Sequence, residues 1–152
     1  MEFGELLKQF LIDLQSLFRA HTKNLNLTLP QIMLMSSIPT DGIDMTSLAQ
    51  RIGVDNSTLT RLIDVLLKNR FVQKNKNPSD GRSILVSLTS SGEILQGAIE
   101  TEIDRFGSEL YRQIPIEDQE EMKEILSSIV NGGAVQVKVP KLYKDKTSSF
   151  IT

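Results

Sequence analysis

The stretch TSLAQRIGVDNSTLTRLIDVLLKN, residues 46–69, decides the fold. Thr46 is expected to cap a short helix and Gly53 to end it, because glycine readily adopts the left-handed conformation that follows a helix C-terminus. Asp55 is expected to cap a second helix, which continues to about Asn69. Two helices joined by a glycine turn form a helix-turn-helix.

The first turns of the second helix carry outward-facing polar side chains, namely Asn56, Ser57, Thr58, Thr60 and Arg61. Small polar residues are poor helix formers, so helix propensity does not explain them. They are suited to bond base edges and phosphates, and the N-terminal end of a recognition helix enters the major groove of DNA. Arg61 can donate to guanine, and Asn56 can reach adenine. The alternative is a solvated face behind an N-cap.

The hydrophobic period changes after the helix-turn-helix. A strand is predicted to open at Phe71. A second strand is predicted from alternating apolar residues, at Ile84, Val86 and Leu88. Residues 75–81 between them are polar or turn-forming throughout. This pattern predicts a β-hairpin over 71–89 with a long basic loop at its tip.

Three basic residues lie in or beside this loop, namely Lys74, Lys76 and Arg82. A basic tip on a stiff ribbon can straddle the phosphate backbone and place an arginine in the minor groove. Asp80 is expected to pair with the guanidinium of Arg82 and hold it extended. The alternative is a turn with an incidental exposed salt bridge, which would contribute less than ~1 kcal/mol. The helix-turn-helix directly upstream favours the DNA-binding interpretation.

Amphipathic helices are also predicted at about 3–22, 29–37, 93–113 and 117–131, where apolar residues recur at helical spacing. A winged helix of ~60 residues does not need the helices at 3–22, 93–113 and 117–131. A two-fold partner is therefore expected to bury the apolar faces of these three helices. A larger monomeric core is the alternative.

Four further residues near these helices give only weak indications of a functional role. His21 is interpreted either as a contact to the dipole at the C-terminus of the first helix or as a surface residue, with a ligand-sensing role as the alternative. Met33, Met35 and Met45 are interpreted as core, with an effector pocket as the alternative, because methionine adapts to ligands.

The composition excludes several classes of function. The 152 residues include no cysteine and one histidine, which excludes disulfides, thiolate metal sites and a His-rich metal centre. No nucleophile–base set and no phosphate-binding loop is present, so we expect no enzyme, no cofactor and no metal. No apolar run approaches the ~18 residues of a membrane span, and charged residues interrupt the N-terminal helix. We therefore expect a cytoplasmic protein without a membrane partner.

The charge is unevenly distributed along the chain. Residues 51–82 carry a net charge of +4, whereas residues 1–50 carry −2 and residues 83–131 carry −7. A basic block between acidic flanks can orient a molecule on a polyanion such as DNA. The alternative is a solvated surface.

A helix-turn-helix followed by a hairpin is a winged helix, and here the sequence resembles the MarR family of transcriptional regulators. The matching stretches are Thr46–Ala49, Val54–Arg61, Leu66–Val72, Asp80–Arg82, Val86, Leu88–Thr89 and Gly92. The resemblance implies a mainly α fold with a small β-hairpin wing. It implies one unit over residues 1–131, in which the winged helix-turn-helix (about 29–92) is flanked by dimerisation helices.

The family further implies an obligate homodimer that binds a pseudo-palindromic operator in double-stranded DNA, and we expect this regulator to be a repressor. Recognition helix 55–69 would lie in the major groove and wing 73–83 in the minor groove. Many members release DNA when a small molecule binds, but the sequence does not identify effector-binding residues here. A winged helix that binds protein and not DNA is the alternative function; it would be expected to show aromatic and apolar residues at positions 56–61.

The chain departs from the family pattern at several positions. Arg70 stands where a glycine commonly closes the recognition helix; a left-handed arginine costs ~1 kcal/mol, so Asn69 is expected to take that conformation instead. Gly81 replaces a frequent second wing arginine, and Asn56 stands where a lysine is common. The tail 132–152 has alternating valines and four lysines; it is expected either to be disordered, to cover the dimer or to add phosphate contacts.

Overall fold

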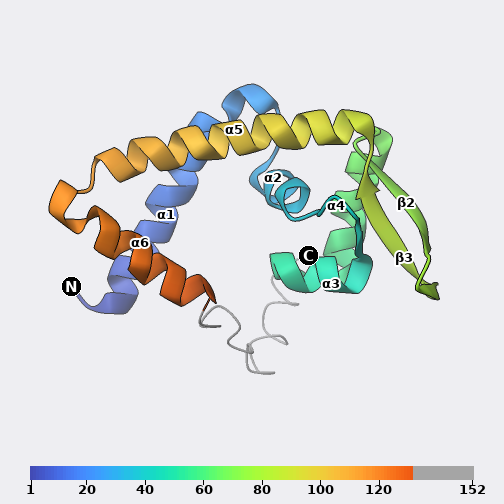
Figure 1. The fold of residues 1–152 in the computed structure, drawn as a ribbon, viewed down its shortest axis with the longest axis horizontal. Coiled ribbons are helices and arrows are strands. Elements are labelled where there is room, and N and C mark those ends of the chain that lie inside the picture. Colours follow the sequence, from blue (N-terminus) through green and yellow to red (C-terminus); the bar gives the residue numbers. More distant parts are fainter. Residues whose placement is uncertain (132–152) are drawn as a thin grey trace. The chain divides into compact units, whose positions relative to one another are not determined.

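The computed structural model describes residues 1–131, so the tail predicted at 132–152 lies outside the described residues. The chain divides into two compact units, Met1–Ser108 and a second that begins at Glu109. The helices and strands follow in the order α1 (Phe3–His21), η1 (Lys23–Leu25), α2 (Leu29–Ser36), β1 (Ile43–Asp44), α3 (Met45–Ile52), α4 (Asn56–Lys68), β2 (Val72–Asn77), β3 (Asp80–Leu88), α5 (Ser90–Arg112) and α6 (Ile116–Asn131) (Figure 1). The predicted fold class, mainly α with a small β wing, is confirmed.

Local capping explains most helix boundaries. Thr28 and Gln31 form the predicted capping box of α2, in which each side chain accepts a hydrogen bond from the other residue's backbone N–H. Asp55 caps α4 as predicted, and Gly53 ends α3 in the left-handed conformation with φ of 72°. The predicted cap of α3 was wrong. Asp44, not Thr46, caps this helix.

The correction at Asp44 has a physical reason. Asp44 is extended because it ends strand β1, and its carboxylate accepts hydrogen bonds from the backbone N–H and the hydroxyl of Ser47, at 2.8 and 2.7 Å. A residue that ends a strand and aims a carboxylate at the next turn is an efficient N-cap. Thr46 therefore lies inside the first turn.

The sheet has three strands in the order β1-β3-β2, all antiparallel. Strand β1 was not predicted, because two residues carry no periodic signal. Ile43 pairs with Val86, and both side chains are buried. The short strand therefore joins the hairpin to the helix-turn-helix.

The predicted long loop at the hairpin tip was also wrong. Strand β2 continues through Lys74 and Lys76 to Asn77, so only Pro78 and Ser79 lie between the strands. Lys76 pairs with Ile84, whereas Asn77 pairs with Asp80, and a bulge accommodates the residues between. The polar composition of the segment reflects an exposed ribbon and not a loop.

The core of the first unit lies where α2, α3, α4, the sheet and α5 meet. Its fully buried side chains are apolar, namely Ile32, Leu34, Met35, Ile38, Leu48, Leu59, Ile63, Leu66, Val86 and Ile99. Met35 agrees with the prediction of a core methionine, whereas Met33 is exposed. Phe106 of α5 packs edge-on against Phe18 of α1, with ring centroids 5.6 Å apart.

The junction after α4 corrects a further prediction. Arg70, not Asn69, is left-handed, with φ of 60°. The hydroxyl of Thr89 donates to the carbonyl of Arg70 at 2.6 Å and accepts from the N–H of Gly92, so Thr89 both caps α5 and holds the strained residue. A Cβ on Gly92 would lie 1.9 Å from the carbonyl oxygen of Phe71. These contacts outweigh the cost of a left-handed arginine.

Two helices expose wide apolar faces. On α1 the exposed apolar residues are Phe3, Leu6, Leu7, Phe10, Leu11, Ile12 and Leu17. On α6 they are Ile116, Met122, Ile125, Leu126, Ile129 and Val130. Within residues 1–131, no helix combines the length and apolar character needed to cross a membrane.

The second unit ties the end of α5 to α6. The side-chain amide of Gln119 donates to the carbonyls of Tyr111 and Ile114, at 3.2 and 3.1 Å. The Lys123 ammonium lies 4.8 Å from the centroid of the Tyr111 ring and 3.6 Å from Glu120. The hydrogen bond to Tyr111 and the charge of Glu120 raise the pKa of Lys123. These contacts position the apolar face of α6 on its own unit.

Candidate nucleic-acid interface

The start of α4 presents the polar side chains that the sequence singled out. Asn56, Ser57, Thr60 and Arg61 are exposed, and Thr58 is half-buried. On the opposite side of the helix, Leu59, Ile63 and Leu66 are buried. The core therefore anchors one side of α4 and leaves the polar side free.

Asp55 organises this polar turn. Its carboxylate accepts hydrogen bonds from the backbone N–H of Thr58 at 2.7 Å and from the hydroxyl of Ser57 at 3.0 Å. These bonds, led by the Thr58 N–H, and the nearby Arg61 charge hold the pKa of Asp55 below its usual value. The carboxylate is thus engaged by its own helix, which limits its repulsion of an approaching phosphate.

The hydroxyl groups of Thr58 and Thr60 make two further hydrogen bonds in this turn. Thr60 donates to the carbonyl of Asn56 at 2.8 Å, four residues back. A guanidinium nitrogen of Arg61 lies 3.5 Å from the Thr58 hydroxyl, so the arginine extends back toward the start of the helix. Arg61 therefore reaches the end of α4 that would approach a major groove.

The wing supplies the second group of candidate residues. Lys74 and Lys76 lie two residues apart on β2, opposite Val86 and Ile84 of β3, so all four share one face of the ribbon. Val86 is buried near the base of the wing, whereas Ile84 and both lysines are exposed. The lysines thus follow the face of the ribbon from the core outward.

The tip of the wing holds Arg82, by a contact that differs from the prediction. Asp80 accepts a hydrogen bond from the backbone N–H of Arg82 at 3.0 Å, and no ion pair to the guanidinium is found among residues 1–131. Asn77 donates to the Ser83 hydroxyl at 3.0 Å and accepts from the N–H of Ser79. Asp80 therefore shapes the backbone of the bulge and leaves the Arg82 side chain exposed.

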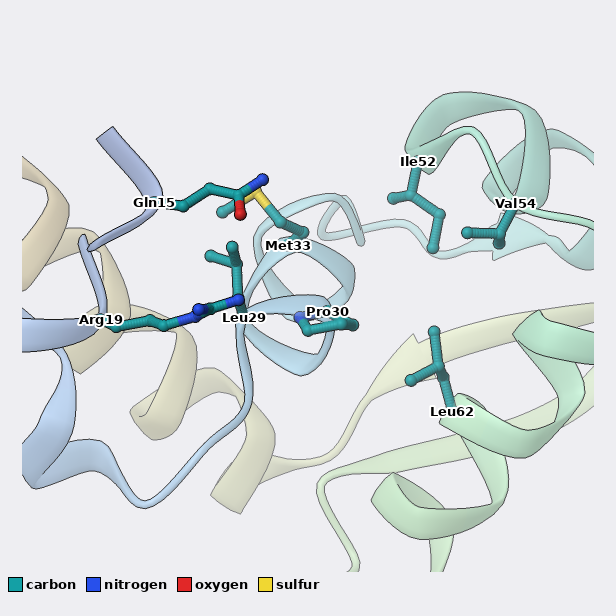
Figure 2. A pocket seen from close by; sticks show the side chains of 8 residues that line it. All are labelled: Gln15, Arg19, Leu29, Pro30, Met33, Ile52, Val54 and Leu62. Carbon is teal, nitrogen blue, oxygen red and sulfur yellow. The ribbon is translucent and has the colours of Figure 1, made fainter. Parts of the chain in front are cut away.

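A groove beside the helix-turn-helix was not predicted as a site. It has a volume of 320 Å³ and is lined by Gln15, Arg19, Leu29, Pro30, Met33, Ile52, Val54 and Leu62. Figure 2 shows the side chains of α1 and α2 along one part of the groove, and Ile52, Val54 and Leu62 along the other. Of the lining residues, only Met33 was considered from the sequence as part of an effector pocket. The others could not be identified, because the groove is formed by four separate segments of the chain.

His21 occupies the helix end to which it was assigned. Its Nδ1 lies 2.9 Å from the carbonyl oxygen of Leu17, and its ring packs edge-on against Phe106 at 5.2 Å. Within the described part of the chain, histidine and carboxylate side chains form no group of three that could hold a metal ion.

The model of the MarR family matches residues 27–84, which run from the residue before the α2 cap into strand β3. Over these residues, the winged helix of this chain is similar to the MarR family. This match confirms the MarR resemblance of the sequence. Members of the family are transcription regulators, so the match also agrees with the expectation that the chain is not an enzyme.

Two curated relatives show the extent of the likeness. The uncharacterized HTH-type transcriptional regulator YhbI of Bacillus subtilis is 24% identical over 105 residues, which cover 68% of each chain. The multiple antibiotic resistance protein MarR of Salmonella typhimurium is 36% identical over 69 residues, which cover 45% of this chain and 48% of that protein. The likeness to MarR thus spans about half of that relative.

The structural likeness extends further than the sequence likeness. The structure of the MepR–DNA complex from S. aureus superposes with a TM-score of 0.71, covering 87% of this chain and 98% of that one at 18% identity. At this identity the match establishes the MarR fold alone. The fold continues well beyond residues 27–84, to the helices on either side of the winged helix.

Proposed function

We propose that the chain is a homodimeric DNA-binding transcriptional regulator, acting as a repressor in the cytoplasm. The observation that carries the proposal is the exposed polar start of α4, with Arg61 extended along it, in a MarR-family winged helix. In this proposal Asn56, Ser57, Thr58, Thr60 and Arg61 contact bases and phosphates in the major groove. Lys74, Lys76 and Arg82 contact the backbone and the minor groove, and Asp80 positions Arg82.

The dimer is supported by exposed apolar surface. The apolar residues of α1 and those of α6 each form a face that is too large to be an ordinary solvent surface. A second copy of the chain would cover these faces in an isologous interface. Two-fold symmetry would then place two α4 helices about one DNA turn apart, ~34 Å, to match a palindromic operator.

The groove around Arg19 supports the proposal of a small-molecule effector. Its wall is apolar except for the Gln15 amide and the Arg19 guanidinium, which suits a small apolar molecule with an anionic or acceptor group. Val54 and Leu62 of the wall belong to the helix-turn-helix, so a ligand there would bias the position of α4.

The effector proposal predicts a result for Arg19→Ala. Small aromatic carboxylic acids are expected to displace operator DNA from the wild type, and the variant is expected to need roughly tenfold more ligand, since a charge-assisted hydrogen bond is lost. Fluorescence anisotropy of a labelled duplex measures this displacement. An equal response of variant and wild type would contradict the assignment of the groove.

A protein-binding winged helix is the competing function. Protein interfaces concentrate aromatic and apolar side chains, whereas positions 56–58 and 60–61 carry polar residues only. This composition favours nucleic acid over protein as the partner of α4.

Selection of fragments from the protein's own genomic DNA tests the proposed function. We expect the full chain to enrich fragments with a pseudo-palindromic sequence. Binding to such a duplex should weaken steeply as salt rises, because basic residues displace counterions from phosphates. Failure to bind any duplex, or binding that is independent of salt, would overturn the proposal.

A further inference from the structure

The turn that follows α2 is held by side chains from two other helices. The Gln96 side-chain nitrogen of α5 donates to the carbonyls of Met35 and Ile38, at 2.8 and 2.9 Å. A guanidinium nitrogen of Arg51, from α3, donates to the carbonyl of Ser37 at 3.0 Å. All of these residues belong to the first unit. Three carbonyls of one short turn are thus bonded by side chains from α3 and α5.

The hydrogen bonds made by Gln96 are directional, unlike the apolar contacts around them. Met35, Ile38 and Ile99 are buried apolar residues, and apolar contacts are non-directional. A planar amide with both N–H groups committed to two carbonyls fixes direction as well as distance. Gln96 therefore resists rotation of α5 against α2, which apolar packing alone would permit.

The position of Gln96 along α5 gives this tie a consequence. At its start, α5 meets the winged helix, where Gly92 lies against Phe71; further along, Phe106 packs on Phe18 of α1. Figure 1 shows α5 running from the wing past α2. Gln96 lies between these contacts, one turn after Gly92, and is half-buried. It adds a second polar tie between α5 and the winged helix, beyond the hydrogen bonds that Thr89 makes at the start of α5.

We propose that Gln96 is a positioning residue that fixes the angle between α5 and the winged helix, and thereby sets the half-site spacing that the protein accepts in DNA. The inference rests on the proposed function as a dimeric regulator. Gln96 touches no DNA in this proposal. It acts through the orientation of α4. A change in the angle between α5 and the winged helix would displace the two recognition helices of a dimer relative to each other.

The test compares Gln96→Met, which keeps the length of the side chain but donates no hydrogen bond, with wild type. The probes are the duplex selected from genomic DNA, the same duplex with one base pair inserted or removed between half-sites, and a single half-site. The wild type is expected to prefer the native spacing. Gln96→Met is expected to lose about tenfold in affinity for that spacing, the order of two neutral hydrogen bonds, and to discriminate less among spacings.

The single half-site separates positioning from a loss of structure. Its affinity is expected to change less than about twofold, since each winged helix keeps its own contacts. Equal losses on the half-site and on the full site, or an unchanged spacing preference, would overturn the inference. Gln113→Met, an exposed substitution of the same chemistry, is the matched control.

A second variant guards against a failure to fold. Gln96→Asn keeps the amide but is one methylene shorter, so it cannot reach both carbonyls and is expected to show the same loss of spacing preference. If both variants unfold, Gln96 maintains the fold itself and the inference is overturned. A wild type that binds no duplex would overturn the proposed function and this inference together, whereas a wild type with a spacing preference that Gln96→Met shares would overturn this inference alone.

Discussion

At the scale of single residues, the candidate interface depends on side chains that the protein holds in place before any partner arrives. Asp55 engages Ser57 and Thr58, and Asp80 engages the backbone of Arg82. Both carboxylates are thus committed to local N–H or O–H donors. The guanidinium groups of Arg61 and Arg82 are exposed, as are the ammonium groups of Lys74 and Lys76.

Arg61 and Lys74 are expected to contribute differently to DNA binding. Arg61→Ala should cost ~1–3 kcal/mol on the selected operator and little on unrelated DNA, because an arginine paired with guanine reads sequence. Lys74→Ala should weaken binding to all sequences alike and reduce the salt slope by ~1, because it removes one phosphate contact. Binding isotherms on operator and scrambled duplexes at several salt concentrations measure both effects. A uniform loss for Arg61→Ala would argue against base readout.

Asp44 and Asp55 predict a specific dependence of stability on pH. Hydrogen bonds from Ser47 to Asp44 and from Thr58 to Asp55 lower the pKa of each carboxyl group below its ordinary value of 3.8. Their stabilisation is therefore complete above pH 3.8 and is lost as the pH falls below it through the lowered folded-state pKa values. The variant with Asp44→Asn and Asp55→Asn is expected to be less stable than wild type near neutral pH.

The difference in thermal midpoint between this variant and wild type should shrink below pH 3.8. Calorimetry at matched protein concentration follows it. Asp41→Asn, at a turn and not at a helix N-terminus, is the control. A difference that stays constant down to pH 2 would show that the two charges do not contribute.

At the scale of elements, the junction between α4, β2 and α5 brings backbone and side-chain groups into close contact. Arg70 is left-handed, Thr89 holds its carbonyl, and Gly92 lies against Phe71. The end of α4 and the start of α5 are therefore joined by the hydrogen bond from Thr89 to Arg70 and by the close approach of Gly92 to Phe71.

Two glycines of α5 give a matched test of this junction. Gly92→Ala is expected to destabilise the fold by about 3 kcal/mol, because its Cβ would overlap the Phe71 carbonyl and the backbone would have to shift. Gly97→Ala meets no atom within 4 Å and is expected to stabilise the helix by ~0.5–1 kcal/mol. Urea denaturation at one protein concentration compares them. Equal stability of the two variants would refute the close approach at Gly92.

At the scale of the whole molecule, the exposed apolar faces of α1 and α6 are the features that a lone chain does not explain. On α6, Ile125 and Ile129 remain 47% and 42% exposed. Residues of this type and number are normally buried, so we expect association through these helices.

Ile125→Glu is therefore expected to weaken dimerisation by roughly 100-fold, since it would bury a carboxylate in an apolar interface. Ser127→Glu adds the same charge on the opposite side of α6 and should leave association unchanged. Sedimentation velocity over a range of concentrations measures the dissociation constant. A wild type that is monomeric at micromolar concentration would remove the basis of the dimer.

The sequence alone was sufficient for the helices, the fold class and the polar start of α4. These features depend on apolar periodicity and on caps such as Thr28 and Asp55, whose hydrogen bonds reach only three residues along the chain. Neighbouring residues encode such short-range contacts directly.

Only the tertiary structure decided the features that depend on distant partners. Strand β1 exists because Ile43 meets Val86, and Arg70 becomes left-handed because Thr89 holds it. The hydrogen bonds of Gln96 reach carbonyls at the end of α2 and in the turn after it. The groove at Arg19 is formed by four separate segments of the chain. The physical reason is that these contacts form between groups remote in sequence, so no local pattern records them.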